Sequence, residues 1–534
     1  MTDSNPRTGD DDNLPVEKLP TGMSSVDIVA KGGLPKNRTT LISGTAGSGK
    51  TVFAMQFLAA GIRDADEHGV FVTFEESARD IRRNMRGFGW DLAQWERDGK
   101  LAFVDASPDP HIETVVVGAF DLAALIARVE HAVRRVGATR VSVDSIGAIF
   151  SQFTDQSIVR RELARIAAGL KQLGTTAVLT AERSDDYGPI ARFGVEEFIA
   201  DNVIILRNSL EDESRRRTLE IVKFRGTDHQ KGEFPFTITS DAGLLAIPLS
   251  AIQLRQHSSN VRITSGNTEL DAMCGGGFFR DSVILVSGAT GTGKTLMVTQ
   301  FLNGGAGPAE RCLLLGFEES REQLFRNATG WGVDFERLER EGTLKVVCDY
   351  PDVAGLEDWL VTIQAIIRDF KPKRVALDSL SALERIGTAK AFREFVLGMT
   401  SFIKQQEITG LFTATTTSLM GGASITEAHI STLTDSIILL RYVEMFGEMK
   451  RGMTVLKMRG SRHDKGIREF TIDESGMHVL SRFMNVTGIL AGHPVHLSPT
   501  ELERVWTEHE ASAGHRNPPP GVDRRAGHDR RRER

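Results

Sequence analysis

The stretch LISGTAGSGKTVFAMQFL, residues 41–58, joins an apolar run to an amphipathic run through a glycine-rich loop. Its centre, Gly44–Thr51, fits the P-loop pattern G-x-x-x-x-G-K-[ST]. The glycines permit a tight loop whose N–H groups surround phosphates, the lysine reaches the β- and γ-phosphates, and the threonine hydroxyl binds Mg²⁺. The stretch therefore predicts a nucleotide-binding domain in which a strand precedes the loop and a helix follows it.

The same stretch recurs in the second half of the chain as ILVSGATGTGKTLMVTQFL, residues 284–302, with a P-loop at Gly288–Thr295. The two motif lysines, Lys50 and Lys294, lie 244 residues apart. Three further pairs of motifs follow in the same order: FEES at Phe74–Ser77 and Phe317–Ser320, VSVDS and VALDS at Val141–Ser145 and Val375–Ser379, and KFRG and KMRG at Lys223–Gly226 and Lys457–Gly460. Shared order indicates a duplicated domain and two ATP sites.

The 534 residues exceed what one hydrophobic core can organise. Helical segments such as Ala123–Val136 separate short β-branched runs at Thr40–Ser43, Val70–Phe74, Val141–Asp144, Ala177–Thr180 and Val203–Leu206. This alternation predicts the α/β class, with a mostly parallel sheet flanked by helices in each domain. We predict a disordered tail over 1–14, a first domain over 15–249, a second over 250–482, and a tail over 483–534 that is basic and disordered at its end.

Composition excludes several classes of protein. The formal net charge of −6 gives no overall basic footprint for nucleic acid. The cysteines Cys274, Cys312 and Cys348 form neither a disulfide framework nor a CxxC pair. No apolar run approaches the ~20 residues of a membrane helix. We expect a cytoplasmic protein. An insertion near His111–Phe120 in the first half is either a longer surface loop or a docking site.

Carboxylates recur at the ends of predicted strands. Asp144 and Asp378 suit the residue that holds Mg²⁺ through water, although such an aspartate can also cap the next helix. The pairs Glu75–Glu76 and Glu318–Glu319 lie at the sheet edge that faces the ligand in open α/β folds. One of each pair can act as a general base while the other orients the attacking group; the alternative is an acidic first turn of a helix.

The KFRG and KMRG motifs place a lysine and an arginine on alternate positions of a predicted strand. Such a pair can reach the γ-phosphate held by a neighbouring subunit, which requires a ring; the alternative is an exposed basic face. Ahead of these motifs, Glu197–Phe198 in the first half aligns with Ser431–Thr432 in the second. Only the second half thus has two hydroxyl acceptors there, unless they are ordinary turn residues.

Further segments are more specific than the P-loops. They are SPDP (Ser107–Pro110), YGPIARFGVEEF (Tyr187–Phe198), LDAMCGGGFF (Leu270–Phe279), GLEDWL (Gly355–Leu360), AHISTLTD (Ala428–Asp435) and MRGSRHDK (Met458–Lys465). With them the chain resembles, over about Pro15–Leu497, the KaiC family of circadian clock ATPases and autokinases, tandem members of the RecA-like superfamily. The resemblance implies a double-ring hexamer with ATP between subunits. It also implies slow ATP hydrolysis in the first ring and reversible phosphorylation of Ser431 and Thr432 in the second.

The resemblance carries over further roles, residue by residue. Glu318 matches the base that activates the acceptor hydroxyl, Glu75 and Glu76 match the water-activating pair, and Trp331 matches an adenine-side residue. The catalytic set comprises Glu75, Glu76, Glu318, Glu319, Lys50 and Lys294, and the metal set Thr51, Asp144, Thr295, Glu318 and Asp378. The other nucleotide contacts are expected at Gly47, Ser48, Gly49, Lys50, Thr51, Val52, Thr290, Gly291, Thr292, Gly293, Lys294, Thr295 and Leu296, and, from the neighbouring subunit, at Lys223, Phe224, Arg225, Thr227, His229, Lys457, Met458, Arg459, His463 and Lys465.

Partners and departures follow from the same resemblance. The KaiB-binding loop of the family matches Val116–Ala123, within the inserted stretch. Thr426 matches a hydroxyl near the acceptors, whereas Glu427 replaces the usual aspartate. Similarity to KaiA-binding tails is weak beyond Leu497, so we predict a member that does not depend on KaiA. Two other functions stay open: a hexameric signalling scaffold without autonomous kinase activity, and a DNA-handling motor, which the acidic balance disfavours.

Overall fold

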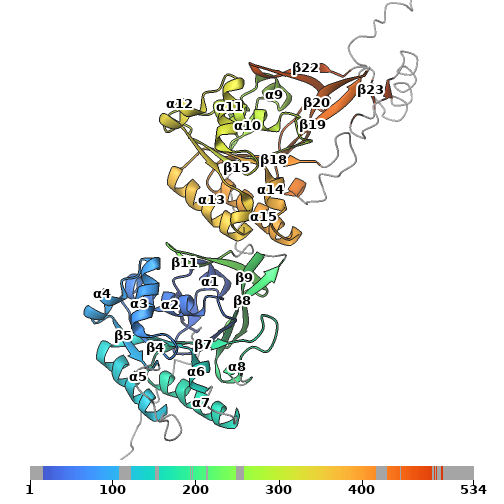
Figure 1. Ribbon diagram of the computed structural model, residues 1–534. Helices are drawn as coiled ribbons and strands as arrows, with labels where there is room; N and C mark the ends of the chain where they lie inside the picture. The colour runs from blue at the N-terminus through green and yellow to red at the C-terminus, as the bar shows by residue number, and fades with distance from the viewer. Residues whose placement is uncertain are drawn as a thin grey trace, which may run out of the picture. The chain divides into compact units, whose positions relative to one another are not determined.

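The computed structural model describes residues 16–107, 122–150, 156–192, 194, 196–211, 214–247, 258–416, 430–445, 447–483, 486–487, 489 and 495–496. The chain separates into two compact units, and each holds one nine-stranded sheet (Figure 1). The first unit comprises Met1–Gln256, Pro351–Arg368 and Leu383–Ser401, and the second comprises His257–Tyr350, Asp369–Ala382 and Phe402–Arg534. The domain boundaries drawn from the sequence stay a prediction.

The first large sheet has the strand order β11-β10-β9-β8-β3-β7-β6-β4-β5. Its strands are β3 (Thr39–Gly44), β4 (His68–Thr73), β5 (Leu101–Asp105), β6 (Ala138–Asp144), β7 (Thr176–Glu182), β8 (Asn202–Glu211), β9 (Ser214–Phe224), β10 (Glu233–Thr239) and β11 (Gly243–Ala246). Pairing from β8 through β3 to β5 is parallel, and β8 to β11 pair antiparallel. This confirms a mostly parallel sheet, with the P-loop strand β3 near its middle.

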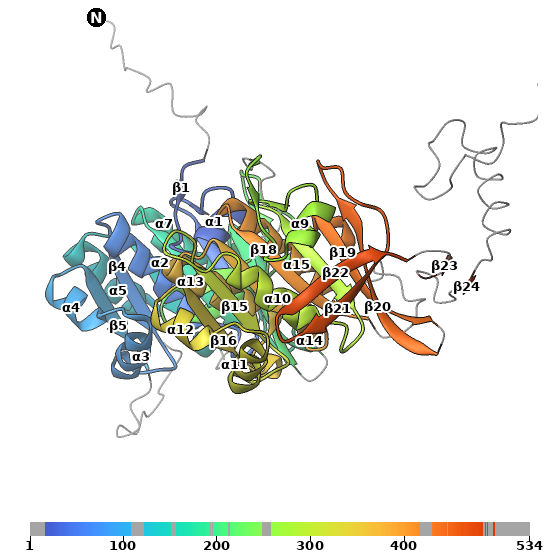
Figure 2. The same cartoon turned by 90° about the horizontal axis from the view of Figure 1, so that it is seen from above.

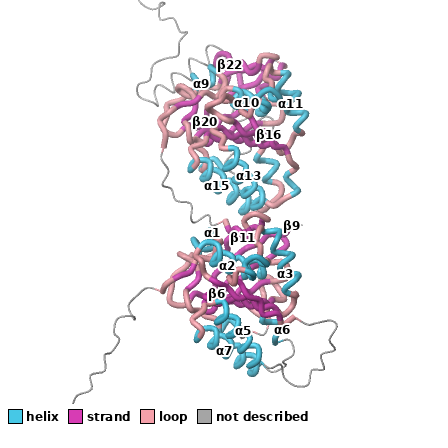
Figure 3. Tube along the Cα trace, turned by 90° about the vertical axis from the view of Figure 1, so that its left-hand side faces the viewer, coloured by secondary structure: helices cyan, strands magenta, loops and turns pink. Residues whose placement is uncertain are grey.

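Helices lie on both faces of the first sheet (Figures 1 and 3). They are α1 (Ser24–Val29), α2 (Lys50–Asp64), α3 (Ala78–Met85), α4 (Leu92–Arg97), α5 (Leu122–Val136), α6 (Ile146–Phe150), α7 (Gln156–Gln172) and α8 (Glu196–Ile199). One core packs α2 against one face, and another packs α5 and α7 against the opposite face. The predicted apolar stripe of α5 is confirmed, because Leu125, Val129 and Val133 are all buried. A small pair, β1 (Lys18–Leu19) and β2 (Leu34–Pro35), lies outside this sheet.

The second large sheet repeats this topology in the order β16-β15-β17-β18-β14-β19-β20-β21-β22. Its strands are β14 (Val283–Gly288), β15 (Cys312–Gly316), β16 (Leu344–Cys348), β17 (Arg374–Asp378), β18 (Thr409–Thr415), β19 (Ser436–Met445), β20 (Glu448–Met458), β21 (Arg468–Asp473) and β22 (Gly476–Arg482). The antiparallel strands β19 to β22 are drawn in orange and red in Figure 2. The repeat predicted from the motifs is therefore also a repeat of topology.

The second half contains α9 (Thr268–Met273), α10 (Lys294–Asn303), α11 (Arg321–Gly330), α12 (Phe335–Arg340), α13 (Leu356–Phe370), α14 (Leu380–Glu384), α15 (Ala389–Gln405) and the short 3₁₀ turn η4 (Ile430–Thr432). A core of β14, α10 and α11 residues, such as Val286, Phe301 and Leu324, packs one face of this sheet. Two small pairs of strands also belong to this half: β12 (Arg262–Ile263) with β13 (Phe278–Phe279), and β23 (Val486–Thr487) with β24 (Val495–His496). Two further 3₁₀ helices are η1 (Arg86–Phe88) in the first half and η3 (Pro351–Val353) in the second.

Each half also buries an arginine that the motif analysis did not single out. Arg140 in β6 and Arg374 in β17 are only 1% and 2% exposed. The Arg374 guanidinium pairs with Glu310 at 3.1 Å and donates to the carbonyls of Thr264 and Phe301 at 2.8 and 2.9 Å. This side chain therefore ties three segments of the second half to one another.

Replacing Arg374 by methionine is expected to lower the unfolding temperature of the second domain by about 5–10 °C, the equivalent of ~3 kcal/mol. The physical reason is that the carbonyls of Thr264 and Phe301 lose their arginine donor, and the Glu310 carboxylate loses this ion pair and keeps only the 3.3 Å pair with Arg280 among its described partners. Thermal unfolding of the full chain measures the change. The neighbouring Lys373 is exposed, so Lys373→Met serves as the control and should leave the transition in place.

Candidate active sites

The two P-loops have the same local construction. Strands β3 and β14 end at the first glycine of the motif, and helices α2 and α10 begin at the motif lysine. The Lys50 Nζ donates to the carbonyls of Gly44 and Thr45 at 3.1 and 3.0 Å. Lys294 Nζ makes the corresponding bonds at 2.9 and 3.1 Å. Each loop therefore curls around its lysine at the carboxyl end of a parallel strand and the N-terminus of a helix, a position that favours anions.

The last motif glycine is required by both conformation and space. Gly49 and Gly293 have φ angles of +91° and +104°. A Cβ at Gly49 would lie 2.7 Å from the Ile238 Cδ1 atom, and one at Gly293 would lie 2.9 Å from the Ile472 Cδ1 atom. The positive φ therefore favours glycine, and a Cβ would in addition push the tip of an isoleucine of the antiparallel strands out of place.

A hydroxyl and a carboxylate meet beside each P-loop. Thr51 Oγ1 donates to Asp144 Oδ2 at 2.7 Å, and the Thr180 hydroxyl donates to the other carboxylate oxygen. In the second half Thr295 donates to Asp378 at 2.8 Å, and Thr413 supplies the second hydroxyl. The P-loop threonine and the strand-end aspartate therefore lie together in both halves, and their Mg²⁺ role stays a prediction.

Burial also sets the protonation tendencies of these groups. It raises the pKa of Asp144 and of Asp378, and it lowers the pKa of Lys50 and of Lys294. A divalent cation would favour the charged carboxylate. Among the residues that the structure describes, no three His, Cys, Asp or Glu side chains gather to hold a metal by themselves. The residues nevertheless fit Mg²⁺, which usually keeps several waters and binds one or two carboxylates together with substrate phosphates.

The paired glutamates follow strands β4 and β15, and the two members of each pair have different partners. Glu75 Oε1 accepts a hydrogen bond from Ser145 at 2.6 Å, and Glu318 Oε1 accepts one from Ser379 at 2.8 Å. Both serines follow the metal-candidate aspartate through a cis peptide bond. The first glutamate of each pair is thus tied to the residue next to the metal candidate.

The second glutamate of each pair is tied to the following helix. Glu76 and Glu319 accept hydrogen bonds from Asn84 and Asn327 at 3.0 and 2.9 Å. Burial raises the pKa of Glu319, and the nearby Asp378 charge acts in the same direction. The hydrogen bonds distinguish the two members: the first glutamates lie beside the serine next to the metal candidate and are the base candidates, and the second glutamates, held by the following helix, are the orienting candidates.

Sequence reasoning missed three pairs of supporting residues: the serines Ser145 and Ser379, the threonines Thr180 and Thr413, and the asparagines Asn84 and Asn327. Their signal was recurrence in both halves; the threonines lie 233 residues apart, one fewer than the offset of the aspartates. The asparagines lie 243 residues apart, the offset of the glutamate pairs, and the serines 234 apart, the offset of the aspartates. Recurrence marked these positions, but only the folded chain brings them to the carboxylates.

The basic motifs lie at the ends of β9 and β20. These strands end at Phe224 and Met458, so the prediction that both basic residues belong to the strand is wrong by one position: Arg225 and Arg459 come directly after it. Lys223 Nζ donates to the carbonyls of Glu197 and Ala200, both at 2.8 Å. The pair therefore contacts the segment that precedes the neighbouring strand of its own chain.

The second half repeats this contact at the predicted acceptors. Ser431 and Thr432 belong to η4, just before β19, and the Thr432 side chain is exposed. Lys457 Nζ donates to the Thr434 carbonyl at 2.7 Å, and Arg459 donates to the Thr432 carbonyl at 2.7 Å. The corresponding segment of the first half, which contains Glu197 and the exposed Phe198, is helix α8.

The remaining predicted nucleotide contacts lie outside the P-loops and the glutamate pairs. Trp331 directly follows the end of α11 and packs against the core of the second half. Thr227 and His229 lie between β9 and β10, and His463 and Lys465 lie between β20 and β21. Some predicted positions lie outside the described residues. They are the insertion at 111–120, positions 116–121 of the predicted docking loop, Thr426 and Glu427.

Fold and sites together define a tandem P-loop ATPase with two RecA-like domains. The family model for "ATPase: KaiC" matches residues 19–250 and 263–483. The chain is 65% identical over 490 residues to "Circadian clock protein KaiC3" of Synechocystis sp., with 92% of this chain and 97% of that protein covered. It is 57% and 56% identical over 493 residues to "Circadian clock oscillator protein KaiC" of Thermosynechococcus vestitus and of Synechococcus elongatus, with 92% of this chain and 95% of each relative covered. The chain belongs to the KaiC family, and the family predicted from the sequence is confirmed.

Proposed function

We propose that this protein is an ATP-hydrolysing autokinase and autophosphatase of a timekeeping or stress-signalling system. The first domain hydrolyses ATP, and the second transfers the γ-phosphate to Ser431 or Thr432 and later removes it. The observation that carries this proposal is a contrast between two otherwise matched halves. Both halves have a P-loop lysine, a carboxylate–hydroxyl pair and a glutamate base candidate. The segment that precedes β19 contains two hydroxyl side chains, whereas the matching segment before β8 contains none.

The proposed chemistry assigns one task to each group. Glu318 takes the proton of the acceptor hydroxyl while the hydroxyl oxygen bonds to the γ-phosphorus of ATP. The bond between the γ-phosphorus and the β–γ bridging oxygen breaks, and ADP leaves. Lys294 stabilises the phosphate charge, and Thr295 and Asp378 would hold Mg²⁺, which neutralises the phosphate oxygens. In the first domain, where the aligned segment has no hydroxyl, Glu75 activates water instead.

A homohexamer completes this proposal, because the acceptor and the ATP it receives phosphate from would belong to adjacent subunits. The Arg459 side chain supports the arrangement: it holds the Thr432 carbonyl, yet 53% of its surface is exposed and can meet a neighbour's phosphate. We further propose a KaiB-like partner at the loop Val116–Ala123, phosphorylation without KaiA, and a cytoplasmic location, which the three unpaired cysteines support. In the part of the chain that the structure describes, no helix has the length and apolar character to cross a bilayer.

Phosphopeptide mass spectrometry of the purified full-length protein with Mg²⁺ and ATP tests the proposal. We expect phosphate on Ser431, Thr432 or both without any added partner. Ser431→Ala and Thr432→Ala should each remove one site, and the double variant should remove all incorporation while ATP hydrolysis in the first domain continues. Chelation of Mg²⁺ by EDTA should stop both activities.

Hydrolysis without phosphate incorporation in an intact hexamer would contradict an autonomous kinase and would favour the signalling scaffold. Phosphate on residues other than this pair would contradict the assignment of the acceptors. The double alanine variant is the matched control, because it retains both P-loops and both glutamate pairs.

A further inference from the structure

An aspartate directly precedes strand β8 in the first half and strand β19 in the second, and its hydrogen-bond partners differ between the two halves. In the first half, Asp201 accepts hydrogen bonds from the Thr39 backbone N–H and hydroxyl at 3.3 and 3.5 Å, and Arg225 donates to it at 3.4 Å. In the second half the residue that corresponds to Thr39 is Val283, which has no hydroxyl group. The backbone N–H of Val283 still donates to Asp435, at 2.9 Å.

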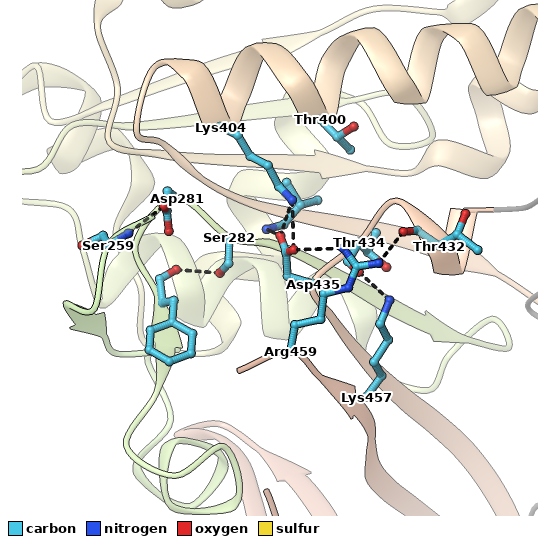
Figure 4. Close-up of polar contacts among 12 residues, drawn as sticks. Ser259, Asp281, Ser282, Thr400, Lys404, Thr432, Thr434, Asp435, Lys457 and Arg459 are labelled. Carbon is cyan, nitrogen blue, oxygen red and sulfur yellow. Dashed lines mark hydrogen bonds and ion pairs between the residues drawn. The ribbon is translucent and has the colours of Figure 1, made fainter. Parts of the chain in front are cut away.

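A lysine replaces the missing hydroxyl. Lys404, from the last turn of α15, lies 2.9 Å from Oδ1 and 2.8 Å from Oδ2 of Asp435, and both side chains are only 19% exposed (Figure 4). The residue at the same place in α7 is Lys171, one position before the end of that helix, and it is exposed. The tight lysine–aspartate pair thus belongs to the half that contains the acceptors.

The neighbouring arginine also has different contacts in the two halves. Arg459 stays 3.7 Å from Asp435, longer than the 3.4 Å of Arg225 from Asp201. Its guanidinium also donates to the Thr432 carbonyl at 2.7 Å, as Figure 4 shows. Since Lys404 already neutralises and hydrogen-bonds the carboxylate, Asp435 attracts the arginine less strongly, and the arginine can bind the acceptor turn.

We propose that Lys404 is a positioning residue for phosphate transfer: by neutralising Asp435, it leaves Arg459 to hold the turn that contains Ser431 and Thr432. The proposal rests on the proposed kinase function and deepens it. Without the lysine, the Asp435 charge draws Arg459 away from the Thr432 carbonyl. The turn then loses the Arg459 tether, while Lys457 still donates to the Thr434 carbonyl.

The experiment uses the full-length protein and measures the rate of phosphate incorporation and its partition between Ser431 and Thr432. Lys404→Met is expected to slow incorporation about three- to tenfold and to change the partition. Lys404→Arg should restore both quantities. Lys171→Met, the matched change in the first half, should alter neither.

A double variant separates positioning from a general loss of structure. Asp435→Asn can still accept the Val283 hydrogen bond but removes the charge that Lys404 neutralises. The double variant Lys404→Met/Asp435→Asn should therefore incorporate phosphate faster than Lys404→Met alone. If the two substitutions only damaged the structure, the double variant would be slower than the single one. Wild-type rate and partition in Lys404→Met, or a double variant no faster than the single one, would overturn the inference. Failure of the wild-type protein itself to incorporate phosphate would instead count against the proposed function.

Discussion

Replacing Glu318 by glutamine is expected to reduce phosphate transfer to Ser431 and Thr432 by about 10²–10⁴-fold, the usual contribution of a general base. Glutamine has nearly the same shape and can still accept the 2.8 Å hydrogen bond from Ser379, so the site should keep its structure. It cannot take up the proton of the acceptor hydroxyl. Phosphopeptide quantification over time, at saturating Mg²⁺ and ATP, measures the loss.

The neighbouring glutamate provides the control. Glu319 accepts a hydrogen bond from Asn327 of the following helix, which fixes the carboxylate in place, so we assign it an orienting role. Glu319→Gln should therefore slow transfer much less than Glu318→Gln. ATP hydrolysis by the first domain should persist in both variants, because Glu75 is unchanged. Equal losses in the two variants would remove the assignment of Glu318 as the base.

The two P-loop lysines should separate the two activities. Lys50→Ala should lower the rate of ATP hydrolysis in the first domain by about 10²–10³-fold, because it removes a fixed positive charge that stabilises the transferring phosphoryl group. Lys294→Ala should abolish phosphate incorporation to a similar extent. The reason is the same in both halves: each lysine lies at the centre of its loop, within hydrogen-bonding distance of two loop carbonyls that phosphate oxygens would replace as partners.

Each lysine variant serves as the experimental control for the other, because the two lysines lie in the same local fold. Phosphate release should be followed beside site-resolved phosphorylation in the same samples, with hexamer formation checked by size. Loss of phosphorylation in Lys50→Ala with an intact hexamer would mean that the second domain depends on turnover in the first. Undiminished phosphorylation in Lys294→Ala would contradict the assignment of the second P-loop as the phosphate donor site.

Much of the fold could be predicted from the sequence because its signals are local. The spacing of Gly44–Thr51 and Gly288–Thr295 requires a strand before each loop and a helix after it, and β3–α2 and β14–α10 have that form. The alternation of β-branched runs with helical segments likewise predicted parallel sheets. Where local signals are weak, as at the ends of β9 and β20, the prediction was wrong by one residue.

The supporting groups of the site could not be derived in the same way. Ser379 is 61 residues from Glu318, and Thr413 is 35 residues from Asp378, so no local pattern connects either pair. They meet because the carboxyl ends of neighbouring parallel strands lie at one edge of the sheet. The order of those strands is a property of the whole domain, and a residue's neighbours across the sheet are fixed only when the chain folds.

By itself, the sequence determined that this chain has two P-loop halves, belongs to the KaiC family and has the Ser431–Thr432 pair in only one half, because motifs and their offsets are read along the chain. Only the tertiary structure decided which donors the carboxylates have. The exchange of Thr39 for Val283 becomes meaningful when Lys404 is found on Asp435, 31 residues away in the chain. The physical reason is that charge neutralisation depends on distance in space, which side chains acquire only through packing.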